Sequence, residues 1–116
     1  MTHGLKTIVY PVKDPGPAKA LFRALFGVEP YTDEPYYVGF RTDTHEIGID
    51  PRGHAKGMTG PVPYWTVTDI RQTLTALVEA GAKPLQDVQD VGGGTLIASV
   101  RDPDGNFVGL FQDAPA

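Results

Sequence analysis

Residues 100–112 read VRDPDGNFVGLFQ, a pattern that predicts a β-hairpin. An apolar strand arrives, the DPDG segment of residues 102–105 turns the chain, and a second apolar strand leaves. Pro103 suits the first central turn position because its ring fixes φ, and Gly105 tolerates the positive φ that closes such turns. Gly109 is unexpected in the departing strand, because glycine weakens a strand and has no side chain to pack.

Strands and helices follow the same order in both halves of the chain. The apolar pattern of the first half predicts a strand, a helix and a hairpin at residues 5–12, 17–26, 36–42 and 45–50. The second half predicts a strand, a helix and three strands at residues 62–69, 70–81, 82–91, 95–100 and 106–112. Pro17 and Asp69 suit helix starts, and Gly27 and Gly81 suit helix ends. Residues 51–61, PRGHAKGMTGP, predict a linker.

The two halves also match in sequence. Residues 12–14 (VKD) align with residues 67–69 (VTD), residues 26–30 (FGVEP) with 80–84 (AGAKP), and residues 46–50 (EIGID) with 107–111 (FVGLF). A half of about 50 residues cannot bury its own sheet, so the copies are expected to pack together, in one chain or across a dimer. The sequence therefore predicts a single domain, residues 1–116, with modules at 5–50 and 62–112.

Four short motifs in this duplicated pattern resemble the vicinal oxygen chelate superfamily, which includes glyoxalases, bleomycin-resistance proteins and extradiol dioxygenases. They are YPVKD (10–14), VTDI (67–70), EAGAK (79–83) and DPDGN (102–106). The resemblance runs from Leu5 to Gln112. It implies an α+β fold in which two βαβββ modules form a cup-shaped mixed sheet with the helices outside. It also implies a ligand inside the cup and a homodimer.

The resemblance also implies where a metal would bind. Metal-dependent members place His, Gln or Glu at four cup-facing positions, one on the first and one on the last strand of each module. These positions correspond to Thr7, Gly48, Val62 and Gly109. Such a site needs imidazole or carboxylate donors, which these residues lack, so we expect no metal and no cofactor. The two glycines are open to two interpretations: they accommodate curvature or a bulge in the sheet, or they open the cup floor for a ligand.

Other catalytic or metal-binding patterns are weak. His3, His45, Glu46 and His54 have no recognised ligand spacing and are expected to be exposed polar residues. Ser99 lacks the Gly-x-Ser-x-Gly elbow of a nucleophile. The absence of cysteine excludes disulfides and thiolate chemistry.

Strand parity predicts which side chains line the cup, because alternate residues of a strand share a face. The predicted ligand-binding set is Thr7, Val9, Glu46, Asp50, Val62, Tyr64, Thr66, Phe107, Gly109 and Phe111. This largely apolar lining with few polar anchors is typical of small-molecule pockets, although the aromatic rings could instead fill the cup as core. Glu46 is the candidate acid or base, or else an ion-pair partner of a neighbouring cation. Trp65 is expected to face the helix layer and to belong to the core.

Composition and net charge argue against two further classes of function, nucleic-acid binding and membrane insertion. The chain has 116 residues and a net charge of −4 with no basic run, which argues against nucleic acid and mildly favours a cationic over an anionic ligand. No apolar stretch approaches the roughly 20 residues of a membrane span, so we expect a cytoplasmic protein. We predict a metal-free, homodimeric protein that sequesters a small organic ligand. The alternatives are a glyoxalase-like lyase or isomerase or a dioxygenase with atypical catalytic residues, and an interaction module with a vestigial cup.

Overall fold

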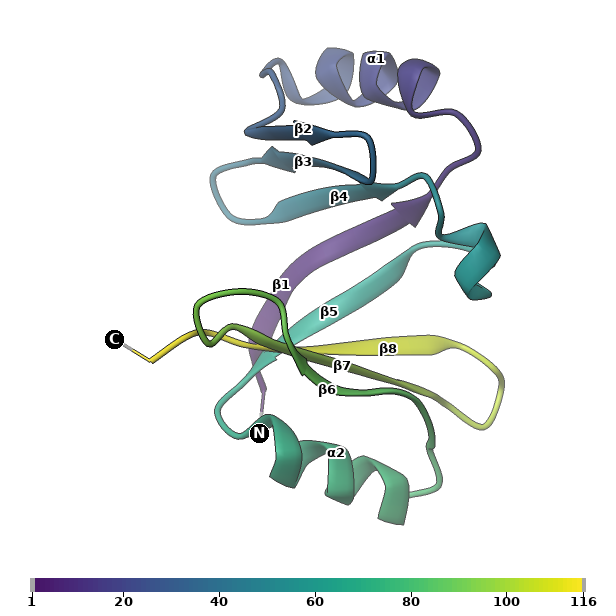
Figure 1. The fold of residues 1–116 in the computed structure, drawn as a ribbon, viewed down its shortest axis with the longest axis vertical. Helices are drawn as coiled ribbons and strands as arrows, with labels where there is room; N and C mark the ends of the chain where they lie inside the picture. The colour runs from purple at the N-terminus through teal and green to yellow at the C-terminus, as the bar shows by residue number, and fades with distance from the viewer. Residues whose placement is uncertain (1, 116) are drawn as a thin grey trace. The chain divides into compact units, whose positions relative to one another are not determined.

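A computed structural model describes residues 2–115 and contains the βαβββ order twice (Figure 1). The first copy consists of β1 (Thr2–Pro11), α1 (Pro15–Phe26), β2 (Thr32–Glu34), β3 (Tyr37–Arg41) and β4 (Glu46–Asp50). The second consists of β5 (Val62–Val67), α2 (Ile70–Glu79), β6 (Lys83–Asp90), β7 (Leu96–Arg101) and β8 (Phe107–Gln112). The predicted α+β fold with two βαβββ modules is therefore confirmed.

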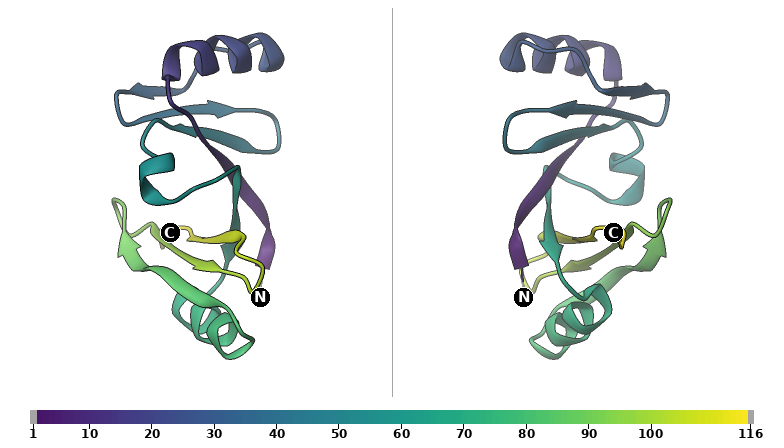
Figure 2. Two further views of the ribbon diagram at one scale, coloured as in Figure 1. Left: turned by 90° about the vertical axis from the view of Figure 1, so that its right-hand side faces the viewer. Right: turned by 90° about the vertical axis from the view of Figure 1, so that its left-hand side faces the viewer.

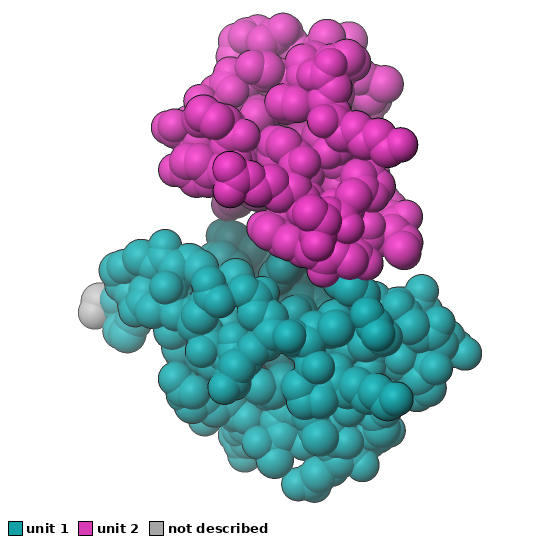
Figure 3. Space-filling model, turned by 45° about the vertical axis from the view of Figure 1, so that its right-hand side comes forward, with its two compact units in different colours: residues 1–6, 63–116 teal, residues 7–62 magenta. Residues whose placement is uncertain are grey.

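The chain divides into two compact units, coloured separately in Figure 3. Unit 2 contains residues 7–62, and unit 1 contains residues 1–6 and 63–116. The strand β1 therefore contributes its first residues to unit 1 and the remainder to unit 2. The boundary at residues 62 and 63 lies beside the predicted start of the second module.

In unit 2 the strands are hydrogen bonded in the order β2-β3-β4-β1. Neighbours are antiparallel except β1 and β4, which are parallel. The helix α1 covers one face of this sheet (Figures 1 and 2). It begins at the N-cap Asp14, whose carboxylate accepts from the Gly16 N–H at 3.0 Å, and ends at Gly27, which adopts the left-handed conformation at φ 70°. Its buried face packs on an apolar core of Phe22, Val38, Phe40, Ile47 and Ile49.

In unit 1 the first residues of β1 are followed by strands in the order β5-β8-β7-β6. The strands β5 and β8 are parallel, and β6, β7 and β8 are antiparallel neighbours with register shifts in β6. The helix α2 covers one face (Figure 2) and packs over Val67, Ile70, Ala98 and Leu110. Its first turn is held by the Asp69 carboxylate, which accepts from Gln72 N–H at 3.1 Å, and by Gln112 Oε1, which accepts from Ile70 N–H at 2.7 Å.

The predicted hairpin of residues 100–112 is confirmed. The Gly105 N–H donates to the Asp102 carbonyl at 3.0 Å, and Gly105 has a φ of 89°, the positive value that the turn requires. The Asp102 carboxylate also accepts from the side chain and backbone of Asn106, and these bonds lower the pKa of Asp102. This turn sets the register that places Gly109 opposite Ser99 of β7.

Some boundaries differ from the prediction. The strand β1 starts three residues earlier than expected, at Thr2, and α1 starts at Pro15. The short strand β2 lies where the polar sequence TDE carries no strand signal of its own. The expected linker contains a 3-10 helix, His54–Lys56, followed by the buried Met58. No helix within residues 2–115 is long and apolar enough to cross a membrane.

Candidate functional site

The helix-free face of unit 2 presents the side chains that parity predicted for the cup. The register pairs Thr7 with Glu46, Val9 with Gly48 and Pro11 with Asp50. The alternate residues Ile47 and Ile49 belong to the core beneath α1. The predicted residues Thr7, Val9, Glu46 and Asp50 therefore share the face opposite the helix.

Two glycines on this helix-free face lie beneath tyrosine rings. Gly39 of β3 and Gly48 of β4 are directly paired. A Cβ atom built on Gly48 would overlap the Tyr37 ring and hydroxyl, and one on Gly39 would lie 2.8 Å from the Tyr31 ring. Glycine lets the aromatic rings approach the backbone closely at both positions, and a larger residue would force the rings to move. The side chain missing from Gly48 is thus replaced by a ring of the same unit.

A polar cluster of Tyr31, Arg41 and Glu46 lies beside these glycines. The Tyr31 hydroxyl donates to Glu46 Oε1 at 2.9 Å, and Arg41 Nη2 lies 3.7 Å from Glu46 Oε2. The Arg41 guanidinium also lies over the Tyr31 ring, 4.2 Å from its centroid. Burial of the phenol, together with the bond to Glu46, raises the pKa of Tyr31 above its usual range. The cluster therefore holds a neutral phenol, a guanidinium and a carboxylate within one small area.

The Asp50 carboxylate has partners within its own turn. Its Oδ1 accepts from Arg52 N–H at 2.8 Å, and its Oδ2 accepts from Lys56 Nζ at 2.8 Å. The Asp50 side chain is 9% exposed, whereas Lys56 is 63% exposed. This arrangement fixes the turn into the 3-10 helix, so Asp50 has a structural role whether or not it meets a ligand.

The helix-free face of unit 1 carries the remaining predicted aromatic residues. Tyr64 and Thr66 of β5 are paired with Gly109 and Phe111 of β8. The Tyr64 ring covers Gly109 closely enough that a Cβ there would overlap it. Cations lie over the two phenylalanines: Lys6 Nζ is 5.0 Å from the Phe111 centroid, and the Arg101 guanidinium is 5.3 Å from that of Phe107.

Gly109 thus repeats the arrangement at Gly48. Neither glycine is exposed as bare backbone, because an aromatic ring of the same unit covers each one. Neither of the two interpretations drawn from the sequence, curvature or an open floor, included this arrangement. The signal available in the sequence was the number of tyrosines near the predicted strands, namely Tyr31, Tyr36, Tyr37 and Tyr64.

The side chains at the four positions that would ligate a metal do not fit one. The Thr7 hydroxyl donates to the Glu46 carbonyl at 2.7 Å, Val62 is a buried apolar side chain, and Gly48 and Gly109 carry no donor atom. Divalent ions of this type require imidazole, carboxylate or amide donors. Within residues 2–115, no three His, Cys, Asp or Glu side chains gather into a group that could hold a metal.

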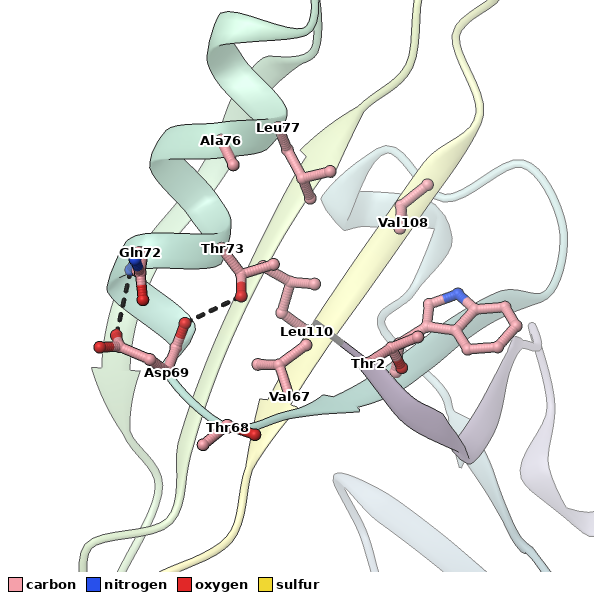
Figure 4. Close-up of a pocket in the computed structure, with 11 residues that line it drawn as sticks. Thr2, Val67, Thr68, Asp69, Gln72, Thr73, Ala76, Leu77, Val108 and Leu110 are labelled. Atoms are coloured by element: carbon pink, nitrogen blue, oxygen red, sulfur yellow. Dashed lines mark hydrogen bonds between the residues drawn. The ribbon is translucent and has the colours of Figure 1, made fainter.

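Trp65 faces the helix side of unit 1, as expected, but it lies outside the core cluster. Its half-buried indole forms one wall of a pocket between α2 and the strands β5 and β8 (Figure 4). The sequence analysis did not predict this pocket.

Comparison with known proteins agrees with this architecture. A family model described as Glyoxalase/Bleomycin resistance protein/Dioxygenase superfamily matches residues 4–110. A search of curated proteins found no match. A superfamily member from Vibrio splendidus 12B01 superposes with a TM-score of 0.73 at 17% identity, over 94% of this chain and 99% of that chain.

Two enzymes are similar in fold as well. Methylmalonyl-CoA epimerase from Mycobacterium tuberculosis has a TM-score of 0.69 at 14% identity, over 98% of this chain and 90% of that chain. The Mn(II)-bound glyoxalase from Novosphingobium aromaticivorans has a TM-score of 0.72 at 21% identity, over 97% of this chain and 40% of that chain. At such low identity these structures share the fold with this chain, and their activities are not transferred to it.

Proposed function

The chain belongs to the glyoxalase/bleomycin resistance protein/dioxygenase superfamily, and we propose that within it this protein binds a small organic molecule without a metal. The observation that carries the proposal is that the four positions where the resemblance would place metal ligands carry no suitable side chain. Thr7 is committed to a backbone carbonyl, Val62 is apolar, and tyrosine rings cover Gly48 and Gly109.

The helix-free faces offer suitable binding chemistry in place of a metal. Tyr37 and Tyr64 provide aromatic surface on the helix-free faces of their units. Phe107 and Phe111 of β8 add to this surface in unit 1. The Tyr31–Arg41–Glu46 cluster adds a few charged and hydrogen-bonding atoms at one place. Apolar surface with a small number of polar anchors is the usual composition of a small-molecule site. We further propose that the protein is a homodimer, as is usual for the superfamily.

Native mass spectrometry of untagged protein tests the binding proposal. We expect a noncovalent adduct of an organic molecule at a stoichiometry of one per cup, which organic solvent releases unchanged. Replacing Tyr64 with alanine should weaken the adduct, because it removes the ring above Gly109. Tyr64→Phe keeps the ring and should retain the adduct. Equal adduct on Tyr64→Ala and the parent protein would contradict the proposed site.

A second candidate function is favoured by the contact between Tyr31 and Glu46. A carboxylate held by a phenol and a guanidinium can accept a proton from a bound substrate, which would make the protein a metal-free lyase or isomerase. In that case the released molecule would differ chemically from the one supplied, and Glu46→Gln would abolish the conversion while retaining binding. Recovery of the supplied molecule unchanged, with both the parent protein and Glu46→Gln, would reject the enzyme.

A further inference from the structure

A pocket of about 630 Å³ lies on the helix side of unit 1, opposite to the face proposed above to bind ligand. The helix α2 packs on β6, β7 and β8, and the pocket opens where β5 and β8 lie beside it (Figure 4). Residues of β5, α2 and β8 line the pocket, among them Trp65, Asp69, Leu77 and Leu110. Small-molecule sites have volumes of roughly 300–1,000 Å³, so this pocket has a suitable size.

The internal repeat explains why the pocket exists. The helix N-caps Asp14 and Asp69 are equivalent, and the same spacing makes Tyr10 equivalent to Trp65 and Phe22 equivalent to Leu77. In unit 2 the Tyr10 and Phe22 rings touch, with centroids 5.0 Å apart, and they fill the space between strand and helix. In unit 1 the smaller Leu77 stands where a phenylalanine stands in unit 2. The space that the second aromatic ring would fill therefore remains open beside Trp65.

The lining of the pocket is mostly apolar, and its hydroxyl groups are already bonded. The Thr2 hydroxyl donates to the Thr66 carbonyl at 2.9 Å, and the Thr73 hydroxyl donates to the Asp69 carbonyl at 2.9 Å. The Thr68 hydroxyl lies 2.5 Å from His3 Nε2. The interior surface consists of valine, leucine and alanine side chains with the indole, which favours an apolar, flat molecule.

The charge of the pocket lining favours some apolar, flat molecules over others. Asp69 is the ionisable side chain of the lining, and its Oδ1 accepts from the Gln72 N–H. Its Oδ2 has no hydrogen-bond partner among residues 2–115. A carboxylate and an indole among the lining side chains favour a hydrogen-bond donor or a cation and disfavour an anion.

We propose that this pocket binds a small aromatic compound that carries a hydroxyl or amino donor and no negative charge, with the ring against Trp65 and the donor at Asp69. The site is distinct from the one under the proposed function, and neither depends on the other. Leu77 and Trp65 lie on the helix side of the sheet, whereas Tyr64 and Gly109 lie on the other.

Three one-ring probes that differ in charge and in hydrogen-bonding capacity test the proposal: benzylamine as the cation, benzyl alcohol as the neutral donor and sodium benzoate as the anion, which has no donor. Trp65 is the single tryptophan of the chain, so its fluorescence reports directly on this pocket. We expect saturable changes with benzylamine and benzyl alcohol at dissociation constants on the order of 1 mM, as is usual for ligands of this size. Benzoate should bind at least tenfold more weakly.

The control variants follow from the repeat. Leu77→Phe places the equivalent of Phe22 in the pocket and should abolish the fluorescence titration. Val78→Phe adds the same ring at the next position of α2, which is 39% exposed and outside the pocket, and should leave the titration unchanged. Should Leu77→Phe fail to fold, Ala76→Phe fills the pocket from an exposed helix position and serves the same purpose.

Backbone amide chemical shifts locate the probe independently of fluorescence. Shifts confined to α2, to residues 64–68 and to the Trp65 indole N–H would support the proposal. Shifts confined to residues around Tyr31 and Glu46 would overturn it, since the probes would then occupy the helix-free face. Equal binding of benzoate, or retained binding in a folded Leu77→Phe protein, would also overturn it.

Discussion

The two repeats have the same backbone order but fill their helix layers differently. In unit 2, Phe22 packs between Tyr10, Phe26 and Phe40 with ring centroids 5.0 to 6.4 Å apart, so aromatic rings occupy the layer between helix and sheet. In unit 1, Leu77 leaves a pocket beside Trp65. The opposite faces are alike instead, since in each unit a tyrosine ring lies over a strand glycine, Gly48 in unit 2 and Gly109 in unit 1. The duplicated fold has thus kept its backbone while side-chain volume decides where open space remains.

Truncating the equivalent apolar side chains Phe22 and Leu77, one in each helix layer, should produce the largest losses of stability, and unequal ones. Phe22→Ala deletes a buried ring and should lower the free energy of unfolding by about 3–5 kcal/mol. Leu77→Ala truncates a half-buried side chain that already borders open space, and should cost about 1–2 kcal/mol. Urea denaturation of both variants measures the difference, and equal losses would contradict the contrast between a closed and an open layer.

Adding a methyl group beneath the tyrosines tests the similarity of the opposite faces. Gly48→Ala and Gly109→Ala should each cost about 1–3 kcal/mol, because the new Cβ overlaps a ring. Gly60→Ala is the matched control, since no atom lies within 4 Å of a Cβ there, and it should change stability by less than about 0.5 kcal/mol.

A double-mutant cycle assigns the cost at Gly109 to the ring above it. In a Tyr64→Ala background, Gly109→Ala should cost less than about 0.5 kcal/mol, giving a coupling of about 1 kcal/mol or more. Additive effects would show that the penalty comes from the backbone rather than from Tyr64.

Removing either partner of the ion pair between Asp50 and Lys56 should lower the free energy of unfolding by a smaller amount, and loss of Asp50 should cost more than loss of Lys56. Asp50→Ala removes the acceptor for Arg52 N–H and Lys56 Nζ within a buried turn and should cost about 1–3 kcal/mol. Lys56→Ala removes an exposed ammonium, and water can replace it, so the cost should be about 1 kcal/mol or less. Thermal denaturation of the two variants under the same conditions checks the order, and a larger loss in Lys56→Ala would reverse our assignment.

The Tyr31–Glu46 contact should have the smallest effect, and it should be visible as a pH dependence. The pKa of Tyr31 is raised in the folded state, so the stability it contributes is complete below the ordinary tyrosine pKa of about 10 and is lost as the pH rises through the folded value. Ultraviolet titration should show a late-ionising phenol that is absent from Tyr31→Phe. Loss of a phenol that ionises near the ordinary tyrosine pKa in Tyr31→Phe would contradict the hydrogen bond to Glu46.

Much of this architecture could be predicted because local chemistry determines it. Asp69 marks the start of α2, the DPDG turn closes the last hairpin, and strand parity places Glu46 and Tyr64 on the helix-free faces. The start of α1 was predicted at Pro17, whereas the helix begins at Pro15 after the N-cap Asp14. The tyrosine rings over the glycines could not be predicted, because only the folded sheet determines which strands are neighbours and in which register, as in the pairing of Tyr64 with Gly109.

The pocket was missed for a different reason. It follows from a difference in volume between equivalent positions, Phe22 and Leu77, and hydrophobic periodicity treats both residues alike. Comparing side-chain sizes across the aligned repeats would have revealed it.

We have proposed that this member of the superfamily binds its ligand without a metal. Elemental analysis of untagged protein, with a thermal-shift titration of Mn²⁺, Ni²⁺ and Zn²⁺, is the decisive experiment. We expect no stoichiometric metal and no rise in melting temperature, because Thr7, Gly48, Val62 and Gly109 supply no ligating group. About one tightly held ion per site, with a raised melting temperature, would contradict the claim and would require ligands other than these four residues.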